Sequence, residues 1–303
     1  MGAGVDGTGR GLSFRDRPAS RPVQPAPPGR QDVVAQIFQS SALLLIVALG
    51  GLVAERSGVL NIGLEGMMTI GAFTAVAARV LGASPVLAVA LAALAGVLPA
   101  LLFAQFALRW EANPFITGLA INLLAAGAVP FMSEAFFGTR GSIRLPAGGG
   151  VPIWSVTFVA LAAATLVWFG LEKTVPGLRL RVAGEQPEWL RANAVGVKRY
   201  RLLGLIVSGI FAATAGALLA LRIGAYLPNV SAGRGWIALV IIYLGYRTPP
   251  GLAVAALFFG LMEAASVRAQ VMVAVPPTVL LALPYTLTVI AFVTYSAVRR
   301  RRR

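Results

Sequence analysis

The chain has 303 residues, of which 57% are hydrophobic and only 12% are charged. A soluble domain of this length needs more polar surface, so the composition excludes an ordinary soluble protein and indicates a membrane protein. Cysteine and histidine are absent, which excludes disulfides, thiol chemistry and the commonest metal ligands and proton shuttle. The net charge is +15, and in a chain of membrane spans basic residues mark the cytoplasmic side rather than a nucleic-acid partner.

The beginning of the chain differs in character from the rest. Residues 1–32 are rich in Gly, Pro and Arg and have almost no apolar pattern, which predicts a disordered basic tail. No apolar core follows within the first thirty residues, so the tail is not expected to be a signal peptide. Residues 33–303 are expected to form one transmembrane domain.

From Val33 onward, apolar runs follow one another along the chain. Most have the length of about 17–25 residues that a helix needs to cross a bilayer. Their unbroken character favours helices over the alternating strands of a β-barrel. We therefore expect an all-α, polytopic membrane helix bundle with about nine or ten membrane-embedded segments. The runs lie at 34–54, 67–81, 85–108, 115–133, 153–171, 202–221, 236–246, 251–267 and 278–298.

The distribution of basic residues predicts the orientation of these spans. Residues 172–201 are rich in Lys and Arg, and residues 299–303 are all Arg, so both regions should face the cytoplasm. Nine full spans would leave the basic tail outside, and a segment near the start that is split or crosses halfway would correct this. We therefore expect ten embedded segments with both termini in the cytoplasm.

The stretch ERSGVLNIGLEGMM, Glu55–Met68, places charges and an asparagine between two apolar runs. Its glycines, Gly58, Gly63 and Gly66, suit a broken helix, and irregular backbone at membrane depth is allowed where it lines a cavity or is buried in protein. This stretch is therefore the expected place for the split segment.

Polar side chains of this region allow two interpretations. On a helix Asn61 and Glu65 would share one face, and a carboxylate at the bilayer centre costs roughly 2.5–3.5 kcal/mol, so it should face the bundle interior or a water-filled path. They either bond to a neighbouring helix or contact a substrate, and the same alternatives hold for Asn122. Glu55 and Arg56 are expected to form a local ion pair at the cytoplasmic interface.

Two further patterns concern packing. Glu263 and Arg268 are expected to pair near the outer end of a span. The small residues Ala212–Ala217 predict a close approach between helices.

The segment 172–201 contains a helix signal of its own. Glu185-Gln186-Pro187-Glu188 is typical of a helix start, with proline early and acids in the first turn. The helix is predicted over 187–195, with Trp189 as its apolar anchor and Gly196 as its stop. A helix this short is marginal in water and needs a docking surface. Without further information, that surface is either a protein partner or anionic lipid bound through Arg191 and the basic residues Lys198, Arg199 and Arg201.

ERSGVLNIGLEGMMTIGAF closely resembles the early segment of permease subunits of ABC importers, in the branch that carries nucleosides. Sugar and branched-chain amino acid permeases of the same superfamily have a different stretch here. Three more blocks resemble the family in its order, at residues 113–127, 177–197 and 233–251. The resemblance extends from about Val33 to the C-terminus and implies the ABC importer permease fold. Trp189 and residues 246–250 depart from the family pattern.

The resemblance implies a function: a permease subunit of an ABC importer that moves nucleosides across the bacterial cytoplasmic membrane. Simple sugars such as ribose, or branched-chain amino acids, are the alternative cargoes. The implied substrate pathway includes Asn61, Glu65 and Asn122. The loop 172–201 would contain the coupling helix that sits in a groove of the ATPase, through Gly184, Glu185, Pro187, Glu188, Trp189, Arg191 and Gly196.

The implied partners are an ABC ATPase subunit, a second and non-identical permease subunit, and an extracytoplasmic substrate-binding protein, together with the nucleoside and the bilayer. ATP and Mg would be used by the ATPase, because this chain has no G-x-x-x-x-G-K-[ST] loop, and no cofactor or nucleic acid is expected to bind here.

Other function classes have sequence signatures that we do not find. A stand-alone secondary carrier, the second alternative, should show a repeat with paired broken helices. A membrane enzyme should show a concentrated set of acid, base or metal residues. We therefore expect a transport subunit without catalytic or metal-binding residues.

Overall fold

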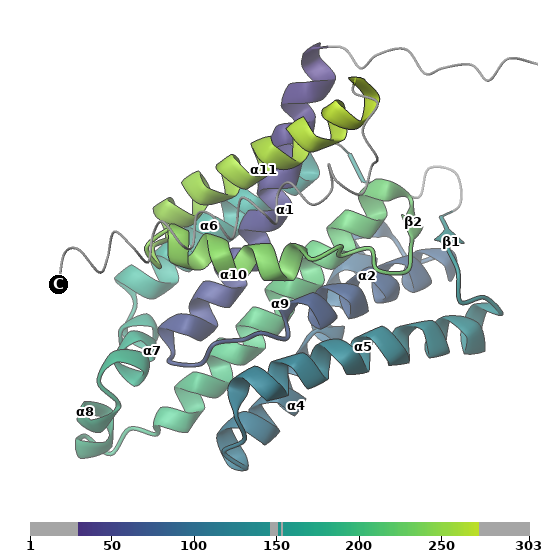
Figure 1. Cartoon of the computed structure of the whole chain (residues 1–303). Coiled ribbons are helices and arrows are strands. Elements are labelled where there is room, and N and C mark those ends of the chain that lie inside the picture. The colour runs from purple at the N-terminus through teal and green to yellow at the C-terminus, as the bar shows by residue number, and fades with distance from the viewer. Residues whose placement is uncertain (1–29, 146–150, 153, 273–303) are drawn as a thin grey trace, which may run out of the picture.

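The computed structural model describes residues 30–145, 151–152 and 154–272, and of residues 30–33 and 269–272 it gives the backbone only. Helices make up most of this part of the chain (Figure 1). They are α1 (Arg30–Arg56), α2 (Leu64–Val80), α3 (Pro85–Ala95), α4 (Val97–Ala104), the π-helix η1 (Gln105–Arg109), α5 (Pro114–Phe137), α6 (Ser155–Lys173), α7 (Val175–Glu185), α8 (Pro187–Ala192), α9 (Val197–Ile223), α10 (Arg234–Leu244) and α11 (Pro249–Met272). Two short strands, β1 (Ile143–Arg144) and β2 (Ala225–Tyr226), pair antiparallel.

The predicted all-α membrane bundle is confirmed. In the described part of the chain, six helical stretches are long and apolar enough to cross a membrane: Val34–Arg56, Pro85–Arg109, Pro114–Phe137, Ser155–Lys173, Val197–Ile223 and Pro249–Arg268. Two further predicted runs form the shorter helices α2, of 17 residues, and α10, of 11. The predicted run 278–298, the terminal arginines and most of the predicted tail lie outside the described residues.

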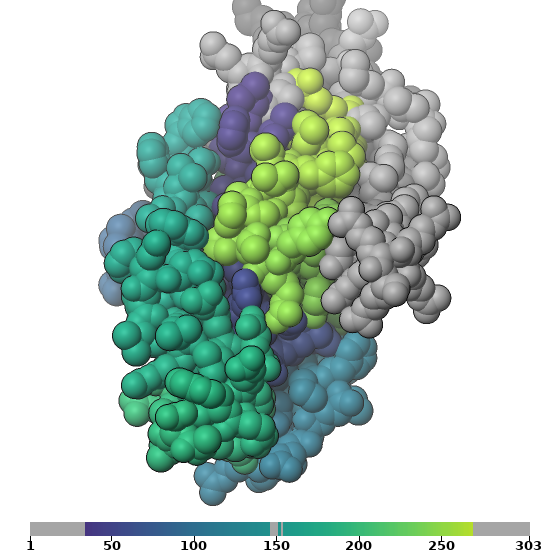
Figure 2. All heavy atoms as spheres, turned by 90° about the vertical axis from the view of Figure 1, so that its left-hand side faces the viewer, coloured from purple at the N-terminus to yellow at the C-terminus, as the bar shows by residue number. Residues whose placement is uncertain are grey.

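Helix α1 occupies the centre of the bundle. In the most apolar 18-residue stretch of this helix, 89% of the residues are buried. Such burial is expected for a helix that is hydrophobic on all sides. It packs against α9, α11, α6 and α10. Figure 2 shows the consequence, because α1 is visible on that face only as a narrow strip between α6–α8 and α11. The start of α1 lies at the opposite end of the bundle from α8 (Figure 1).

Helices α2 and α9 approach each other so closely that only glycine fits at the contact. A Cβ on Gly216 would lie 1.9 Å from the carbonyl oxygen of Met68, and a Cβ on Gly71 would lie 2.1 Å from that of Ala213. Small residues at helix–helix contacts in membranes allow this backbone approach. The predicted close packing around Ala212–Ala217 is confirmed.

The connection between α1 and α2 is irregular, as predicted. Gly58 has a φ of +87°, in the left-handed region that favours glycine, and α2 begins only at Leu64. Asn61 therefore precedes the helix that contains Glu65. The prediction that these two side chains share a helix face was wrong, because the backbone between them is not helical.

The charged residues at the end of α1 pair with distant partners. Glu55 lies 3.5 Å from the Arg247 guanidinium and accepts a hydrogen bond of 3.2 Å from the Tyr243 hydroxyl. Arg56 forms a 3.0 Å ion pair with Glu185. The predicted local pair between Glu55 and Arg56 was wrong, because consecutive side chains on a helix point in different directions.

The predicted pair between Glu263 and Arg268 was wrong for the same kind of reason. Residues five apart on a helix do not share a face, since neighbours on the helix surface are three or four apart. Glu263 of α11 instead accepts a hydrogen bond from Arg234 at the start of α10. This pair ties α11 to α10.

The close contact between α2 and α9 predicts a difference between two glycine substitutions. Gly216→Ala should lower the free energy of unfolding by about 1–3 kcal/mol, because its Cβ meets the Met68 backbone, which cannot move without separating the helices. Gly127→Ala on α5 is the control, since its Cβ would meet nothing within 4 Å. Thermal unfolding of the purified protein in detergent measures both. Equal melting temperatures would contradict the close approach.

Candidate functional site

Asn122 on α5 supports the irregular backbone that precedes α2. Its Oδ1 accepts a 2.8 Å hydrogen bond from the Gly66 N–H, and its Nδ2 donates one of 2.9 Å to the Ile62 carbonyl. Gly118, one turn earlier on α5, allows this approach, because a Cβ there would lie 2.7 Å from the Ile62 Cβ. Backbone groups outside a helix have no partner in the bilayer, so a side chain must supply one.

Asn61 is buried, with 1% of its surface exposed. Its Oδ1 accepts from the Gly63 N–H at 2.9 Å, and its Nδ2 donates to the Ser208 hydroxyl of α9 at 2.9 Å. These bonds give Asn61 the packing role that the sequence also allowed. Its predicted role in the substrate pathway stays a prediction, and the structure does not bring it to the pocket described below.

Glu65 on α2 binds the first turn of α10. One carboxylate oxygen accepts from the Gly233 N–H and the other from the Gly235 N–H, each at 2.7 Å. The first N–H groups of a helix have no partner inside the helix and carry its positive dipole end, so a carboxylate is well placed there. The Glu65 charge is thus stabilised by backbone groups rather than by a basic side chain.

Glu65 and Asn122 also line a cavity of about 340 Å³, which lies between α2, α5 and the segment that follows α9. Its volume falls in the range of about 300–1,000 Å³ that is typical of small-molecule sites. Thr69 and Ser231 lie on its wall with their hydroxyl oxygens 3.2 Å apart. The lining residues are Glu65, Gly66, Thr69, Asn122, Ala126, Pro130, Tyr226, Pro228, Asn229 and Ser231.

The chemistry of this pocket is mainly that of neutral hydrogen-bonding groups beside small apolar surfaces. The amide of Asn229 and the hydroxyls of Ser231 and Tyr226 offer both donors and acceptors. Asn122 has one N–H and one oxygen lone pair left after its bonds to Gly66 and Ile62. A tyrosine phenol is protonated at neutral pH, and burial raises the pKa of Tyr226 still further above its ordinary value.

The segment that follows α9 contributes pocket residues that the sequence analysis missed. Tyr226, Asn229 and Ser231 lie between the apolar runs 202–221 and 236–246. Polar residues in such an interruption, with Pro228 among them, are a weak sign of a binding site in a transporter. The sequence could not show that this segment faces α2 and α5.

The predicted helix in the loop 172–201 exists but is shorter than expected. α8 ends at Ala192 rather than Val195, because Ala194 adopts a left-handed φ of 58° and the Val195 N–H bonds back to the Leu190 carbonyl. Gly196 does not stop this helix; it is the N-cap of α9.

Helix α8 is attached to its own chain through Leu190 and not through Trp189. Leu190 is fully buried and packs with Ala183 and Val197, whereas Trp189 is 57% exposed. Glu188 and Arg191 form an ion pair on the exposed surface of the helix. Trp189 is therefore available to a partner.

The end of α7 connects α8 to the irregular α1–α2 segment. A Cβ on Gly184 would lie 2.4 Å from the Arg56 carbonyl oxygen, and a Cβ on Gly58 would lie 2.9 Å from the Gly184 Cα. The Arg56–Glu185 ion pair lies beside this contact. Gly184 and Glu185, which were predicted to act in coupling, thus touch the segment that leads to Glu65.

These features define a class of protein: a polytopic helical membrane protein with a polar pocket beside an interrupted helix and a short exposed helix at one end of the bundle. The family model for the branched-chain amino acid transport system permease component matches residues 33–293, and the chain belongs to this family. It is a membrane transport subunit and not a catalytic enzyme by itself.

Curated relatives extend over most of the chain. The guanosine ABC transporter permease protein NupQ of Bacillus subtilis is 34% identical and covers 86% of this chain and 90% of its own length. The nucleoside ABC transporter permease protein NupC of Lactococcus lactis is 31% identical, covering 88% and 92%.

A solved structure shares the fold. It is described as "an inward-facing conformation of a putative metal-chelate type ABC transporter", with a TM-score of 0.51, 18% identity, and coverage of 90% of this chain and 91% of that one. At this identity the likeness concerns the fold, and it agrees with the predicted ABC importer permease architecture.

The contact between Glu65 and α10 predicts the effect of removing one charge. Glu65→Gln should lower the free energy of unfolding by about 1–3 kcal/mol, because the amide oxygen is a neutral acceptor for one backbone N–H while the amide NH2 leaves the other backbone N–H without an acceptor. The matched control is Glu134→Gln, whose ion pair with Arg140 is largely exposed and contributes little. Thermal unfolding in detergent compares them, and an equal effect of the two substitutions would refute the proposed strength of the cap.

Proposed function

We propose that this chain is the membrane-spanning permease subunit of an ABC importer that carries nucleosides into the cell. Its membership of the permease family, and its similarity to the guanosine permease NupQ and the nucleoside permease NupC, support the cargo class. The observation that carries the proposal is the pocket of about 340 Å³ with neutral hydrogen-bonding walls.

The pocket suits an uncharged ligand with both polar and flat apolar surface. A nucleoside offers hydroxyl groups and a base edge to the asparagine amides and hydroxyls, and its base has apolar faces for Ala126 and Pro130. An amino acid such as leucine would need partners for two opposite charges. The one carboxylate of the pocket wall, Glu65, already accepts two backbone hydrogen bonds.

Transport also requires that binding be weak and transient, because a tight site would retain the cargo. Neutral hydrogen bonds contribute only about 0.5–1.5 kcal/mol each, so a wall built from them meets this requirement. Asn122 and Glu65 would act as pathway residues that also hold the backbone of the pocket wall in place. Asn61 would position the irregular α1–α2 segment through its bonds to Gly63 and Ser208, without lining the pocket.

The proposed assembly contains partners that hydrolyse ATP and deliver the cargo. An ABC ATPase subunit, which uses ATP and Mg, would receive α8 in a groove, with Trp189 and Arg191 on the exposed surface of the helix. A second, non-identical permease subunit would complete the path, and an extracytoplasmic binding protein would bring the nucleoside. This chain itself would bind no cofactor.

The route from the ATPase to the pocket would follow contacts within the chain. α8 is continuous with α7 through Glu185 and Pro187, and the end of α7 touches Arg56 and Gly58. The segment beyond Gly58 leads to Glu65 on the pocket wall. A displacement of α8 would therefore shift this wall and change access to the pocket.

The loop 172–201 would face the cytoplasm of a bacterial cell, as its basic residues predict. The start of α1, at the other end of the bundle, would then face the outer side (Figure 1). This placement of the start of α1 does not agree with the predicted cytoplasmic N-terminus, whose own residues lie outside the described part of the chain.

Uptake of labelled nucleosides should depend on this gene. Cells that lack it should lose uptake of a purine or pyrimidine nucleoside and keep uptake of ribose and leucine, because those solutes match the pocket chemistry less well. Loss of ribose or leucine uptake alone would keep the family assignment and overturn the proposed cargo.

The role of the pocket in that uptake can be tested in the same cells. Ala126→Trp should reduce nucleoside uptake at least tenfold, because the indole fills much of a cavity of about 340 Å³. A tenfold loss of affinity corresponds to about 1.4 kcal/mol of binding free energy. Leu123→Trp is the matched control, since Leu123 is on the same helix, is exposed and does not line the pocket. Equal uptake by the two variants at equal expression would place the path elsewhere.

Two glycines of the coupling region should respond differently to the same substitution. Gly184→Ala should reduce transport while the complex still hydrolyses ATP, because its Cβ pushes α7 away from the Arg56 backbone. Gly196→Ala should be tolerated, because its φ is −70° and nothing lies within 4 Å of the added Cβ. Uptake and ATPase rates of the assembled complex measure the difference, and full transport by Gly184→Ala would refute the coupling route.

A further inference from the structure

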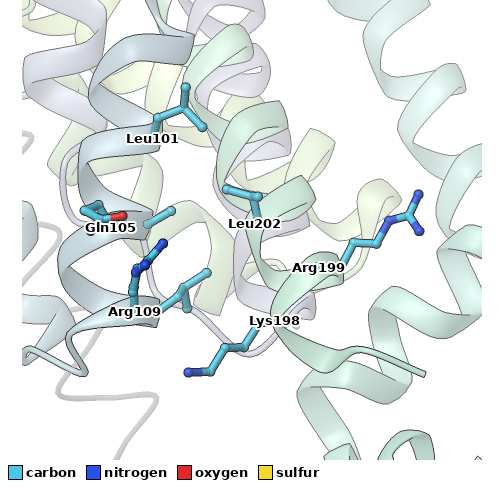
Figure 3. Close-up of a pocket in the computed structure, with 8 residues that line it drawn as sticks. Leu101, Gln105, Arg109, Lys198, Arg199 and Leu202 are labelled. Atoms are coloured by element: carbon cyan, nitrogen blue, oxygen red, sulfur yellow. The ribbon is translucent and has the colours of Figure 1, made fainter. Parts of the chain in front are cut away.

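A second cavity, of about 570 Å³, lies between the α4–η1 segment and the first turns of α9 (Figure 3). It is separate from the pocket at Glu65 and shares no lining residue with it. Half of its lining is apolar and half is polar or basic. The residues are Leu101, Ala104, Gln105, Leu108, Arg109, Lys198, Arg199 and Leu202.

The charges of this cavity are gathered at one end. Arg109 is the last residue of η1, and Lys198 is in the first turn of α9, so both lie at the end of the bundle at which α8 also lies (Figure 1). Figure 3 shows these two side chains near each other at the lower end, Leu101 at the upper end, and Arg199 extending away from Lys198. Leu101 and Arg109 are eight residues apart, which corresponds to roughly 12 Å along the helix.

A tryptophan places the basic end of the cavity at the level of the lipid headgroups. Trp110 directly follows Arg109, is exposed, and stacks edge-to-face on exposed Phe106 with a centroid distance of 4.8 Å. Exposed Trp at the end of a span marks the membrane–water interface. The apolar part of the cavity, toward Leu101, then lies at the depth of the acyl chains.

The two cations at the basic end are poorly neutralised by the protein. Among the described residues no acidic side chain pairs with Arg109. Lys198 is 3.6 Å from Glu111, but both side chains are highly exposed, and such a pair is weak. A phosphate group between Arg109 and Lys198 would therefore gain two cationic partners.

The local helix geometry shapes one wall of the cavity. η1 is a π-helical turn that ends the α4–η1 segment, and its wider turn sets the direction in which the last side chains of the segment point. It includes Gln105, Leu108 and Arg109, so the wider turn forms one wall of the cavity.

We propose that this cavity binds an anionic phospholipid of the cytoplasmic leaflet. The phosphate would lie between Arg109 and Lys198, and one acyl chain would follow Leu108, Leu202 and Leu101 into the membrane. Basic pockets between membrane helices at the cytoplasmic side bind anionic headgroups, and the apolar length of this cavity distinguishes a lipid from a free phosphate. The inference does not depend on the identity of the transported solute.

The test is lipid binding by the purified full-length protein. Delipidated protein in detergent is titrated with phosphatidylglycerol, phosphatidylcholine and glycerol 3-phosphate, and bound species are counted by native mass spectrometry. The wild type should retain phosphatidylglycerol in preference to the other two. The double variant Arg109→Gln, Lys198→Gln should bind phosphatidylglycerol at least tenfold more weakly, since each basic group near the headgroup contributes about fivefold.

Two further variants separate a defined site from general attraction. Lys173→Gln combined with Arg179→Gln removes the same charges from exposed positions on α6 and α7 that do not line the cavity, and should leave lipid retention unchanged. Gln105→Trp keeps every charge but occupies part of the cavity, and should weaken retention.

Four results would overturn the proposal. The first two are unchanged phosphatidylglycerol retention by the Arg109, Lys198 double variant and an equal loss of retention by the Lys173, Arg179 control. The other two are unchanged retention by Gln105→Trp and binding of glycerol 3-phosphate as tightly as phosphatidylglycerol. If the Arg109, Lys198 variant instead fails to assemble with its partner subunits and still retains phosphatidylglycerol, the cavity is a protein-docking surface and the lipid proposal is wrong.

Discussion

The break between α1 and α2 depends on hydrogen bonds that other elements supply. A continuous helix satisfies its own backbone, whereas irregular backbone inside a membrane bundle must find partners elsewhere. Asn122 of α5 forms hydrogen bonds to the backbone of Gly66 and Ile62. Asn61 accepts a hydrogen bond from the Gly63 N–H and donates one to the Ser208 hydroxyl of α9. The arrangement of α2, α5 and α9 around this break follows from that requirement.

The same break connects the pocket to the proposed coupling region around Gly184 and α8. Its first residues touch Gly184 at the end of α7, and its last residues lead into Glu65, which caps α10. Close glycine contacts hold α2 firmly against α9. A rigid α2–α9 pair joined to an irregular segment is suited to moving one pocket wall relative to the others.

The two cavities of the bundle differ in chemistry and therefore in the ligands that they fit. The pocket beside Glu65 offers neutral amides and hydroxyls, which suit a solute that must be released again. The cavity beside Arg109 has a basic end at headgroup level and an apolar end, which suit a lipid that stays. On the two proposals, the first site would bind the cargo and the second would bind a lipid of the surrounding membrane.

The sequence by itself determined the helical membrane fold, the interruption after Arg56, the start of α8 at Pro187 and the close packing near Ala213, because each depends on local composition and spacing. Only the tertiary structure decided which charges pair, that Asn61 faces Ser208, and that Tyr226, Asn229 and Ser231 complete the pocket. Glu55 with Arg247 and Glu65 with Gly233 join residues far apart along the chain. Such contacts depend on how the helices pack, which the periodicity of one segment does not encode.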